Sequence, residues 1–293
     1  MWTALNLQSW DEQLINILFP INLLAYMVIQ YTFLNYFTDR RYSMLSLVFL
    51  VLSNFVIFHA TIGYRDITAM YFNCTVIILL ILWDQLRMDG LLWLSALWAG
   101  FMTFIKLEGI GYLLIYFFLI GAILLTQKAI ALRIKLKKLT FFILISSAIF
   151  LFYFLYKIFT FPSTGSPKGG LNLDIMNLTF ELNAEKLSSA ILILKRFLEN
   201  FFFSGNWNIL WVIFFLSLWK YPDRSHNKTI GFLLLALILF LGFYFFSFLL
   251  TQHIVWIKDS DIALSRAILH FFPLVIILII LLNFSYKSIK QQE

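Results

Sequence analysis

Ionisable side chains at the ends of long apolar segments are the residues of this chain that could do chemistry. Charged groups at membrane depth are costly, so they tend to mark functional sites. Four such clusters lie beside apolar runs in the 293-residue sequence. They are Arg65–Asp66 with His59 before them; Lys106 and Glu108 in TFIKLEGIGY; Asp259, Asp261, Arg266, His270 and Pro273 in KDSDIALSRAILHFFP; and Asp11–Glu12 near the start.

These residue types together suit a phosphate-bearing substrate. Arginine and lysine bind phosphate oxygens, while an aspartate acts as a base or holds a divalent cation that bridges phosphates. The sequence therefore predicts Asp66 as the catalytic residue, with the substrate held by Arg65, Lys106, Glu108, Arg266 and His270. No His or Cys spacing predicts a resident metal centre, and the only cofactor compatible with this chemistry is a divalent cation.

Each cluster also has a structural interpretation. Asp66 directly precedes an apolar run and could cap a helix, and Arg65 could extend to the lipid headgroups. Lys106 and Glu108 are two residues apart, which places them on different faces of a regular helix and disfavours a mutual ion pair. Arg266 and the histidine four residues later share a face, which a structural pair or a headgroup contact would also explain. The shared side of the membrane on which the four clusters are expected favours a site.

The composition predicts an all-α, polytopic integral membrane bundle. The chain is 61% hydrophobic and 13% charged, against about 25% charged residues in an average soluble domain. A helix that spans a bilayer needs about 20 mainly apolar residues. Nine segments qualify as candidate transmembrane helices of one domain over residues 1–293: 13–37, 43–60, 67–83, 91–105, 109–127, 139–160, 204–219, 229–251 and 263–286.

The segments that connect these helices alternate in charge. Thirteen of the 22 Lys and Arg residues, with five acids, belong to one set of connections: Arg40, Arg41, Arg87, Lys128, Arg133, Lys135, Lys137, Lys138, Lys220, Arg224, Lys228, Lys287 and Lys290. The positive-inside rule places this set, and with it the C-terminus, in the cytoplasm. We therefore expect a multi-pass protein of the cytoplasmic (inner) membrane. The net charge of +7 reflects this topology and anionic lipid rather than nucleic acid.

Residues 161–203 form the one long connection, which is expected outside the cytoplasm. It begins with the Ser-, Pro- and Gly-rich FPSTGSPKGG, typical of a surface loop. It continues with Leu187, Ile191, Leu194, Leu198 and Phe201 at helical spacing. Polar residues lie mostly on the other side, which predicts one helix lying in the outer interface of the membrane. The single cysteine, Cys74, excludes a disulfide framework within the chain.

Three motifs resemble the GT-C class of membrane glycosyltransferases. Gly63-Tyr64-Arg65-Asp66 is similar to the "GYAD-x-x" loop of that class, and Ala99-Gly100 followed by Lys106-x-Glu108-Gly109 is similar to its "AG-x8-TK-x-EG" motif. The segment with Ser265, Arg266, His270 and Pro273 is similar to "R-x-L-L-x-x-x-P" in the last helices. The resemblance covers residues 50–125 and 260–275.

The resemblance implies a helical bundle with its active site on the outer face. It implies transfer of a sugar from a polyprenyl-phosphate-linked donor to a cell-envelope glycan, lipid or protein, with membrane lipid as the surroundings. The acidic first loop of the class, and the helices between it and the "GYAD" loop, have no counterpart here. The resemblance thus implies a chain that is truncated, one half of a split enzyme with an N-terminal partner polypeptide, or a degenerate relative.

Two other classes of function remain open from the sequence. A transporter or flippase of lipid-linked sugars would also place charged residues at broken helices. Such a protein is expected to carry them near the membrane midplane, whereas the clusters here fall at helix ends. A non-catalytic membrane scaffold would tolerate neutralisation of all these charges.

Overall fold

The computed structural model is all-helical over the residues it describes, 16–106, 108–128, 130–160, 184–221, 227–251, 254, 257 and 262–284, with no strand among them. This confirms that the chain is all-α over the described residues, as predicted. The helices are α2 (Leu18–Phe37), α3 (Arg40–Leu52), α4 (Asn54–Thr61), α5 (Arg65–Leu86), α6 (Asp89–Ile105), α7 (Gly109–Thr126), α8 (Leu132–Thr160), α9 (Ala184–Phe202), α10 (Leu210–Lys220), α11 (Lys228–Leu250), α13 (Ile262–Leu269) and α14 (Phe272–Asn283). Asp11–Glu12, Asp259, Asp261 and the loop 161–183 lie outside the described residues.

Five of these helices are long and apolar enough to cross a membrane: α2, α5, α7, α8 and α11. The number rises to seven if the bent pairs α3–α4 and α13–α14 each form one span. Helices α6 and α10 are apolar but shorter, with 17 and 11 residues. The described part of the chain therefore holds five to seven candidate spans, and the expected nine stay a prediction.

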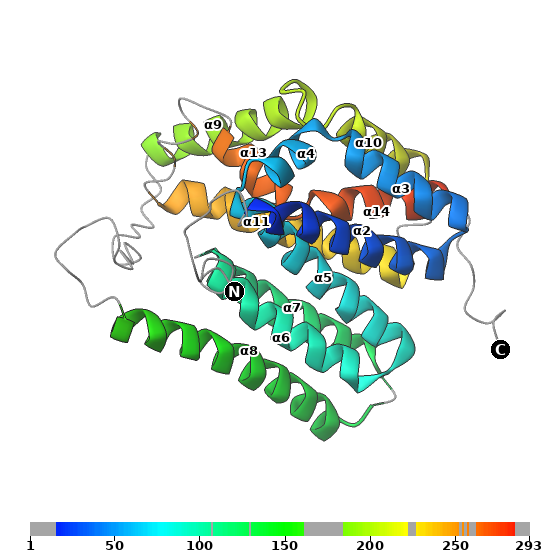
Figure 1. The fold of residues 1–293 in the computed structure, drawn as a ribbon, viewed down its shortest axis with the longest axis vertical. Helices are drawn as coiled ribbons and strands as arrows, with labels where there is room; N and C mark the ends of the chain where they lie inside the picture. Colours follow the sequence, from blue (N-terminus) through cyan, green and yellow to red (C-terminus); the bar gives the residue numbers. More distant parts are fainter. Residues whose placement is uncertain are drawn as a thin grey trace.

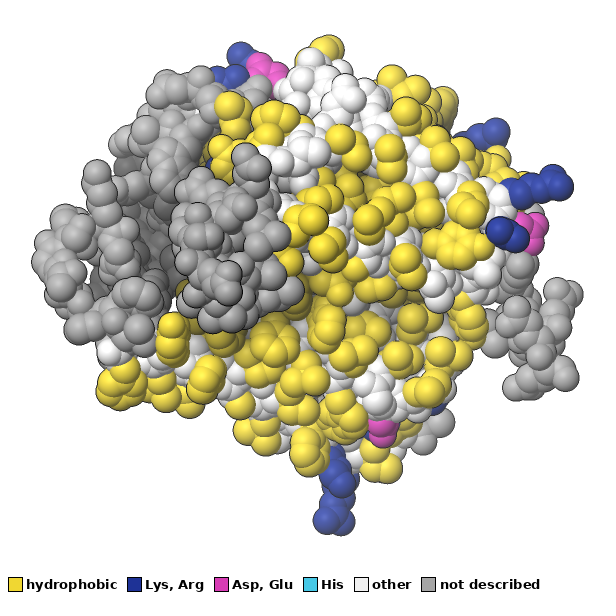
Figure 2. Space-filling model, in the orientation of Figure 1, with side chains coloured by type: hydrophobic (Ala, Val, Ile, Leu, Met, Phe, Trp, Pro, Cys, Tyr) yellow, Lys and Arg dark blue, Asp and Glu magenta, His cyan; other side chains and the backbone are white. Residues whose placement is uncertain are grey.

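The described surface of the molecule exposes many large apolar side chains, as expected of a surface that faces lipid. On the described part of the face drawn in Figure 2, hydrophobic side chains are spread across the surface, and the Lys, Arg, Asp and Glu side chains lie toward its periphery. Leu114, Phe118 and Leu125 of α7 are 58–79% exposed. A soluble monomer rarely exposes a large contiguous apolar patch, so this surface fits a multi-pass membrane protein.

Helices α5 and α14 form the centre of the bundle. Every residue from Phe272 to Leu282 of α14 is buried, and 78% of the apolar window of α5 is buried. Helix α5 packs against α2 on one side and α6 on the other, and α14 packs against α3, α10 and α11. Helix α8 lies at one edge of the molecule, against α6 (Figure 1). A helix that is apolar on every face suits such a central position.

The prediction of a single straight helix over residues 43–60 is wrong. These residues belong to α3 and α4, which meet at an angle of 68°. Ser53 between them has an extended backbone (φ −74°, ψ 103°). The side-chain amide of Asn208 donates to the carbonyl of Leu52 at 2.7 Å, and the hydroxyl of Ser53 donates to the carbonyl of Asn206 at 3.3 Å. Residues of the segment after α9 thus form hydrogen bonds with the backbone carbonyl and the hydroxyl that lie at the break between α3 and α4.

The last predicted helix, 263–286, is also divided in two. Helix α13 ends at Leu269, α14 begins at Phe272, and the two meet at 56°. Pro273 lies in the first turn of α14, where its missing N–H is tolerated. The same proline could not continue α13 without losing a helical hydrogen bond. The break places His270 in the turn between the two helices rather than within one.

Several predicted helix starts were too late, as α5 and α8 illustrate. Residues 67–83 were expected to follow a loop, but α5 begins at Arg65 and includes Asp66 in its first turn. Residues 128–138 were expected to form a basic loop, but α8 begins at Leu132, so Arg133 and Lys138 are helical. In both cases the apolar run marks only the interior of the helix. Polar residues extend it by less than a turn in α5 and by about two turns in α8.

The helix predicted within 161–203 is present as α9, and its surface pattern is amphipathic. Leu187, Ile191, Leu194 and Leu198 are 54–63% exposed, whereas Ile193 and Phe197 are buried. Phe201 was expected in the exposed stripe, but it is 8% exposed and stacks on Trp211 at 4.0 Å. The helix packs on α10, α11 and α13, so one apolar side faces the protein and a second faces outward.

Candidate functional site

The carboxylate of Asp66 is the point at which three of the predicted segments meet. Asp66 is fully buried in the first turn of α5. The Nζ of Lys106 donates to its Oδ1, Nε2 of His270 lies 2.9 Å from the same oxygen, and Nε of Arg266 donates to Oδ2 at 2.8 Å. We refer to these four residues as the Asp66 cluster.

The backbone around each member of the cluster explains its position. Gly63 has a left-handed backbone (φ +80°), which turns the chain so that α5 can start with Asp66 facing inward. Lys106 is the C-cap of α6 and has an extended backbone, so its side chain leaves the helix end. A Cβ on Gly109 would lie 2.6 Å from the carbonyl oxygen of Met102. The close approach of α7 to α6, which fixes the segment around Lys106, therefore requires glycine.

His270 connects the cluster to two buried tyrosines. Its Nδ1 lies 2.6 Å from the hydroxyl of Tyr112 and 2.7 Å from that of Tyr244, and these hydroxyls also bond each other. Because Asp66 only accepts hydrogen bonds, Nε2 of His270 carries the proton and Nδ1 accepts from a tyrosine. The carbonyl of His270 accepts the side-chain amide of Asn73 at 2.8 Å. Both nitrogens of this ring are thus engaged.

The cluster carries more positive than negative charge. Two cationic side chains, Lys106 and Arg266, face the one carboxylate of Asp66. The side chain of Arg266 is 38% exposed and that of Lys106 14% exposed. The guanidinium of Arg266 also lies 4.9 Å from the ring centroid of Tyr64. The surplus charge is therefore within reach of an anionic ligand at the surface.

Two predicted site residues do not join the carboxylate. Arg65 is exposed, and no interaction with the Asp66 cluster involves it among the described residues. Adjacent residues on a helix point about 100° apart, so Asp66 faces inward and Arg65 outward. Glu108 is the N-cap of α7 and does not pair with Lys106 in the described structure.

Sequence reasoning missed several polar residues of this region. Tyr112, Tyr244, Asn73 and Tyr116 form a buried network behind His270, in which the hydroxyl of Tyr116 donates to Asn73 at 2.5 Å. Asn73 lies seven residues after Asp66, on the same face of α5, and that spacing was a usable signal. Tyr244 lies in a continuous apolar run and gave no signal.

No group of three or more His, Cys, Asp or Glu side chains is placed to hold a metal ion within the described residues. Both oxygens of Asp66 already accept bonds from Lys106, His270 and Arg266. A divalent cation at this carboxylate would have to displace at least one of them. The donor set therefore favours binding of an anion by the cations over binding of a metal by Asp66.

A second buried aspartate lies at the other end of α5. Asp84 is 7% exposed and pairs with Lys228 at 2.6 Å and with Arg87 at 3.4 Å. The side-chain amide of Gln127 donates to it at 2.8 Å. We refer to these four residues as the Asp84 cluster. It lies about 27 Å along the helix from Asp66, given the rise of 1.5 Å per residue.

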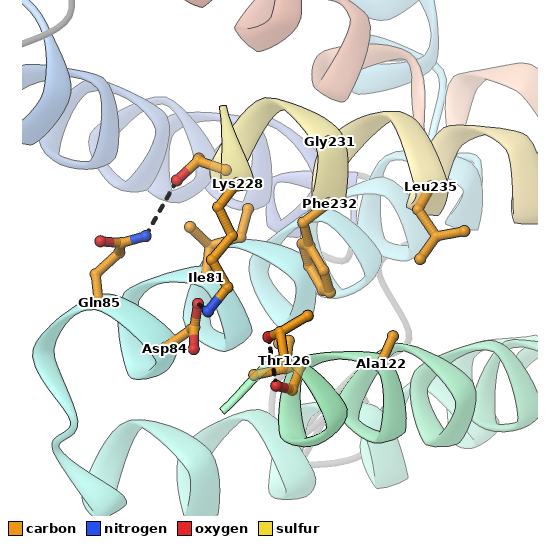
Figure 3. A pocket seen from close by; sticks show the side chains of 11 residues that line it. Ile81, Asp84, Gln85, Ala122, Thr126, Lys228, Gly231, Phe232 and Leu235 are labelled. Carbon is orange, nitrogen blue, oxygen red and sulfur yellow. Dashed lines mark hydrogen bonds and ion pairs between the residues drawn. The ribbon is translucent and has the colours of Figure 1, made fainter. Parts of the chain in front are cut away.

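The Asp84 cluster borders a cavity of about 220 Å³. Figure 3 shows Asp84 and Lys228 joined by an ion pair at this cavity, with Phe232 and Leu235 of α11 and Ala122 of α7 around it. The walls are mainly apolar. Arg87, the C-cap of α5, has a left-handed backbone (φ +58°), so Asp84 and Arg87 belong to the termination of the helix.

Comparisons of the chain with family models, with curated proteins and with solved structures gave no match.

Proposed function

We propose that this protein is a membrane glycosyltransferase of the GT-C type, which transfers a sugar from a polyprenyl-phosphate-linked donor to a cell-envelope glycan, lipid or protein. The observation that carries the proposal is the convergence of Asp66, Lys106 and Arg266. They come from the three segments that carry the resemblance to this class, and 200 residues separate the first from the last. A purely apolar bundle has no need to bring such groups together, because buried charges are costly to desolvate.

The charges suit the departure of a lipid phosphate. When a sugar leaves a phosphodiester-linked polyprenol, the phosphate gains a negative charge. Lys106 and Arg266 are partly exposed and positive, so they are the groups that bind the donor phosphate and stabilise this charge. Asp66 holds the two cations and His270 in place. A direct catalytic role for Asp66 stays a prediction.

The proposed topology follows from the charge pattern of the connections. In it, the Asp66 cluster faces the outer side of the cytoplasmic membrane and the Asp84 cluster faces the cytoplasm. The distance of about 27 Å between the two aspartates along α5 is close to the hydrocarbon thickness of about 30 Å. A span of this length supports placing the two clusters near opposite membrane surfaces.

The test is sugar transfer by membranes that contain the protein. We expect label from a radiolabelled polyprenyl-phosphate hexose to enter envelope acceptors with the wild-type chain. Asp66→Asn should abolish this transfer, and the matched control Asp84→Asn should retain it. Transfer at equal rates by both variants would remove the Asp66 cluster from the site. Absence of transfer by the wild-type chain with a panel of hexose donors would contradict the proposed function.

A transporter or flippase of lipid-linked sugars is the second candidate. The observation that favours it is the pair of broken helices, α3–α4 and α13–α14, with Arg266 and His270 at the second break. Discontinuous helices build the substrate sites of many transporters. In proteoliposomes, movement of a fluorescent lipid-linked sugar between leaflets without sugar transfer would favour this candidate over the enzyme.

A further inference from the structure

His59 presents a buried nitrogen atom with no hydrogen-bond partner beside Asp66. It lies on α4, the short helix after the 68° bend, and is 1% exposed. The centroid of its ring lies 4.1 Å from the ring centroid of Phe55 and 5.5 Å from that of Tyr64. Its Nε2 lies 4.0 Å from Oδ2 of Asp66 and has no hydrogen-bond partner in the described structure. Buried polar atoms in folded proteins are rarely left unsatisfied, so this one needs an explanation.

The hydrogen bond at the other ring nitrogen fixes the tautomer. Nδ1 of His59 lies 3.0 Å from the carbonyl oxygen of Phe55. A carbonyl only accepts, so Nδ1 must carry the proton, and Nε2 of the neutral ring is an acceptor. Asp66 cannot satisfy it, because a carboxylate is an acceptor as well. A water placed beside these two acceptors, which lie 4.0 Å apart, could donate to both. A substrate hydroxyl has a single O–H, which would donate to Nε2 of His59, the atom without a partner.

The two histidines at this site therefore differ in kind. His270 has its Nε2 against Asp66 and Lys106 and its Nδ1 against Tyr112 and Tyr244, so no nitrogen is available. His59 has one nitrogen bonded and one available. Asp66 is not an available base either, since both of its oxygens accept from cationic or N–H donors. Among the described groups at this carboxylate, Nε2 of His59 is the acceptor left to take a proton.

We infer that His59 is the general base of the proposed transfer, and that Asp66 stabilises the imidazolium it becomes. Nε2 takes the proton of the acceptor hydroxyl, and that oxygen forms a bond to the anomeric carbon. The bond from this carbon to the phosphate oxygen breaks, and its electron pair stays on the phosphate. Lys106 and Arg266 hold the additional negative charge. The proton is then released to water, which restores the neutral ring.

Tyr64 is an exposed residue that packs on the ring of His59. This tyrosine is 45% exposed, and it contacts both the ring of His59 and the guanidinium of Arg266. Its displacement would admit a hydroxyl between His59 and Asp66.

The inference rests on the proposed function, and the experiment separates the two. His59→Asn keeps an N–H close to the position of Nδ1, which can still donate to Phe55, but it removes the acceptor at the position of Nε2. We expect the variant to bind radiolabelled polyprenyl phosphate as tightly as wild type and to lose transfer by a factor of about 10² to 10⁴. His59→Gln, which places an amide that cannot be protonated near Nε2, should show the same loss if His59→Asn does not fold.

The pH profile provides a readout that a packing role would not change. The charged and titratable groups that face His59 are Asp66 from α5, Arg266 from α13, Lys106 from the end of α6, and Tyr64. Protonation of His59 removes the base, so wild-type transfer should fall on the acid side. The residual transfer by His59→Asn should lack this fall. His270→Gln should keep it, because His270 has no available nitrogen.

The outcomes are distinct. If His59→Asn and His59→Gln transfer sugar at the wild-type rate and with the wild-type pH profile, the role of His59 is overturned. The proposed function would then stay intact. Absence of both polyprenyl phosphate binding and transfer in the wild-type chain would overturn the proposed function and, with it, this inference. Loss of transfer with retained binding, together with loss of the acid-side fall, would support the inference.

Discussion

Helix α5 carries a buried aspartate near each end, and the two differ in their surroundings. Asp66 at the start is bonded by Lys106, Arg266 and His270. Asp84 near the end is bonded by Lys228, Arg87 and Gln127. Both carboxylates thus face two cations. The cations at Asp84 are 46–48% exposed, whereas those at Asp66 are 14% and 38% exposed.

The larger difference lies behind the ion pairs. Around Asp66 the charges continue into groups that move protons, namely His270 with two tyrosines and His59 with its available nitrogen. Around Asp84 they continue into amides and the end of a helix, where Arg87 adopts a left-handed backbone. In both regions, cationic side chains neutralise the charge of a buried carboxylate. Among the described residues of the two clusters and their neighbours, histidine and tyrosine side chains join the ion pairs at Asp66 and not those at Asp84.

The largest expected effect is that of Asp66→Asn. Removing one partner of a buried ion pair costs about 3–5 kcal/mol, because the remaining charges stay desolvated. We expect a clear fall in the thermal unfolding midpoint of the purified protein in detergent, together with loss of transfer. A midpoint equal to that of wild type would show that the cations at Asp66 are solvated and would remove the contrast with Asp84.

Gly109→Ala is expected to have the next largest effect. Its Cβ would meet the backbone of Met102 and Thr103 at 2.6–2.9 Å, and overpacking of this kind costs about 1–3 kcal/mol. The end of α6 would shift and move Lys106 away from Asp66. Gly90, in the first turn of α6 near the Asp84 end, is the matched control, since a Cβ there meets nothing within 4 Å. Equal unfolding midpoints for Gly109→Ala and Gly90→Ala would contradict the close packing at the Asp66 end.

Asp84→Asn should have the smallest effect of the three. The two cations beside it are about half exposed, so water replaces much of the lost interaction. The expected destabilisation is about 1 kcal/mol, as for a partly solvated ion pair. Thermal unfolding of the purified variant measures it, and transfer should stay at the wild-type level. Destabilisation as large as that of Asp66→Asn would make the two clusters equivalent structural devices.

The sequence predicted most of the helices and named all four members of the Asp66 cluster, for identifiable reasons. Long apolar runs predicted the helices α5, α7 and α11. The charged residues beside such runs identified Asp66, Lys106 and Arg266 as candidate site residues. The bend at Ser53 was missed because hydropathy does not report the direction of the backbone. The break before Pro273 was signalled by the proline itself. The long apolar run around it nevertheless led to the prediction of one continuous helix.

The missed site residues have a different cause. Tyr112 and Tyr244 look like ordinary members of apolar helices, and only tertiary packing brings their hydroxyls to His270. His59 was visible beside Arg65–Asp66, but its role depends on which of its nitrogens is bonded. Arg65 was predicted to bind substrate because arginine suits phosphate oxygens. Helical geometry turns its exposed side chain away from Asp66, and its role stays a prediction.

Binding of polyprenyl phosphate to matched lysine variants tests the central claim most directly. Lys106→Met and Lys228→Met each remove the lysine partner of one buried aspartate, at opposite ends of α5. With the purified protein in lipid nanodiscs, we predict that Lys106→Met weakens binding of radiolabelled polyprenyl phosphate by a factor of 10 or more, a loss of about 1.4 kcal/mol. Lys228→Met should bind as wild type does. Equal binding by the two variants, or loss confined to Lys228→Met, would contradict a lipid-phosphate site at Asp66.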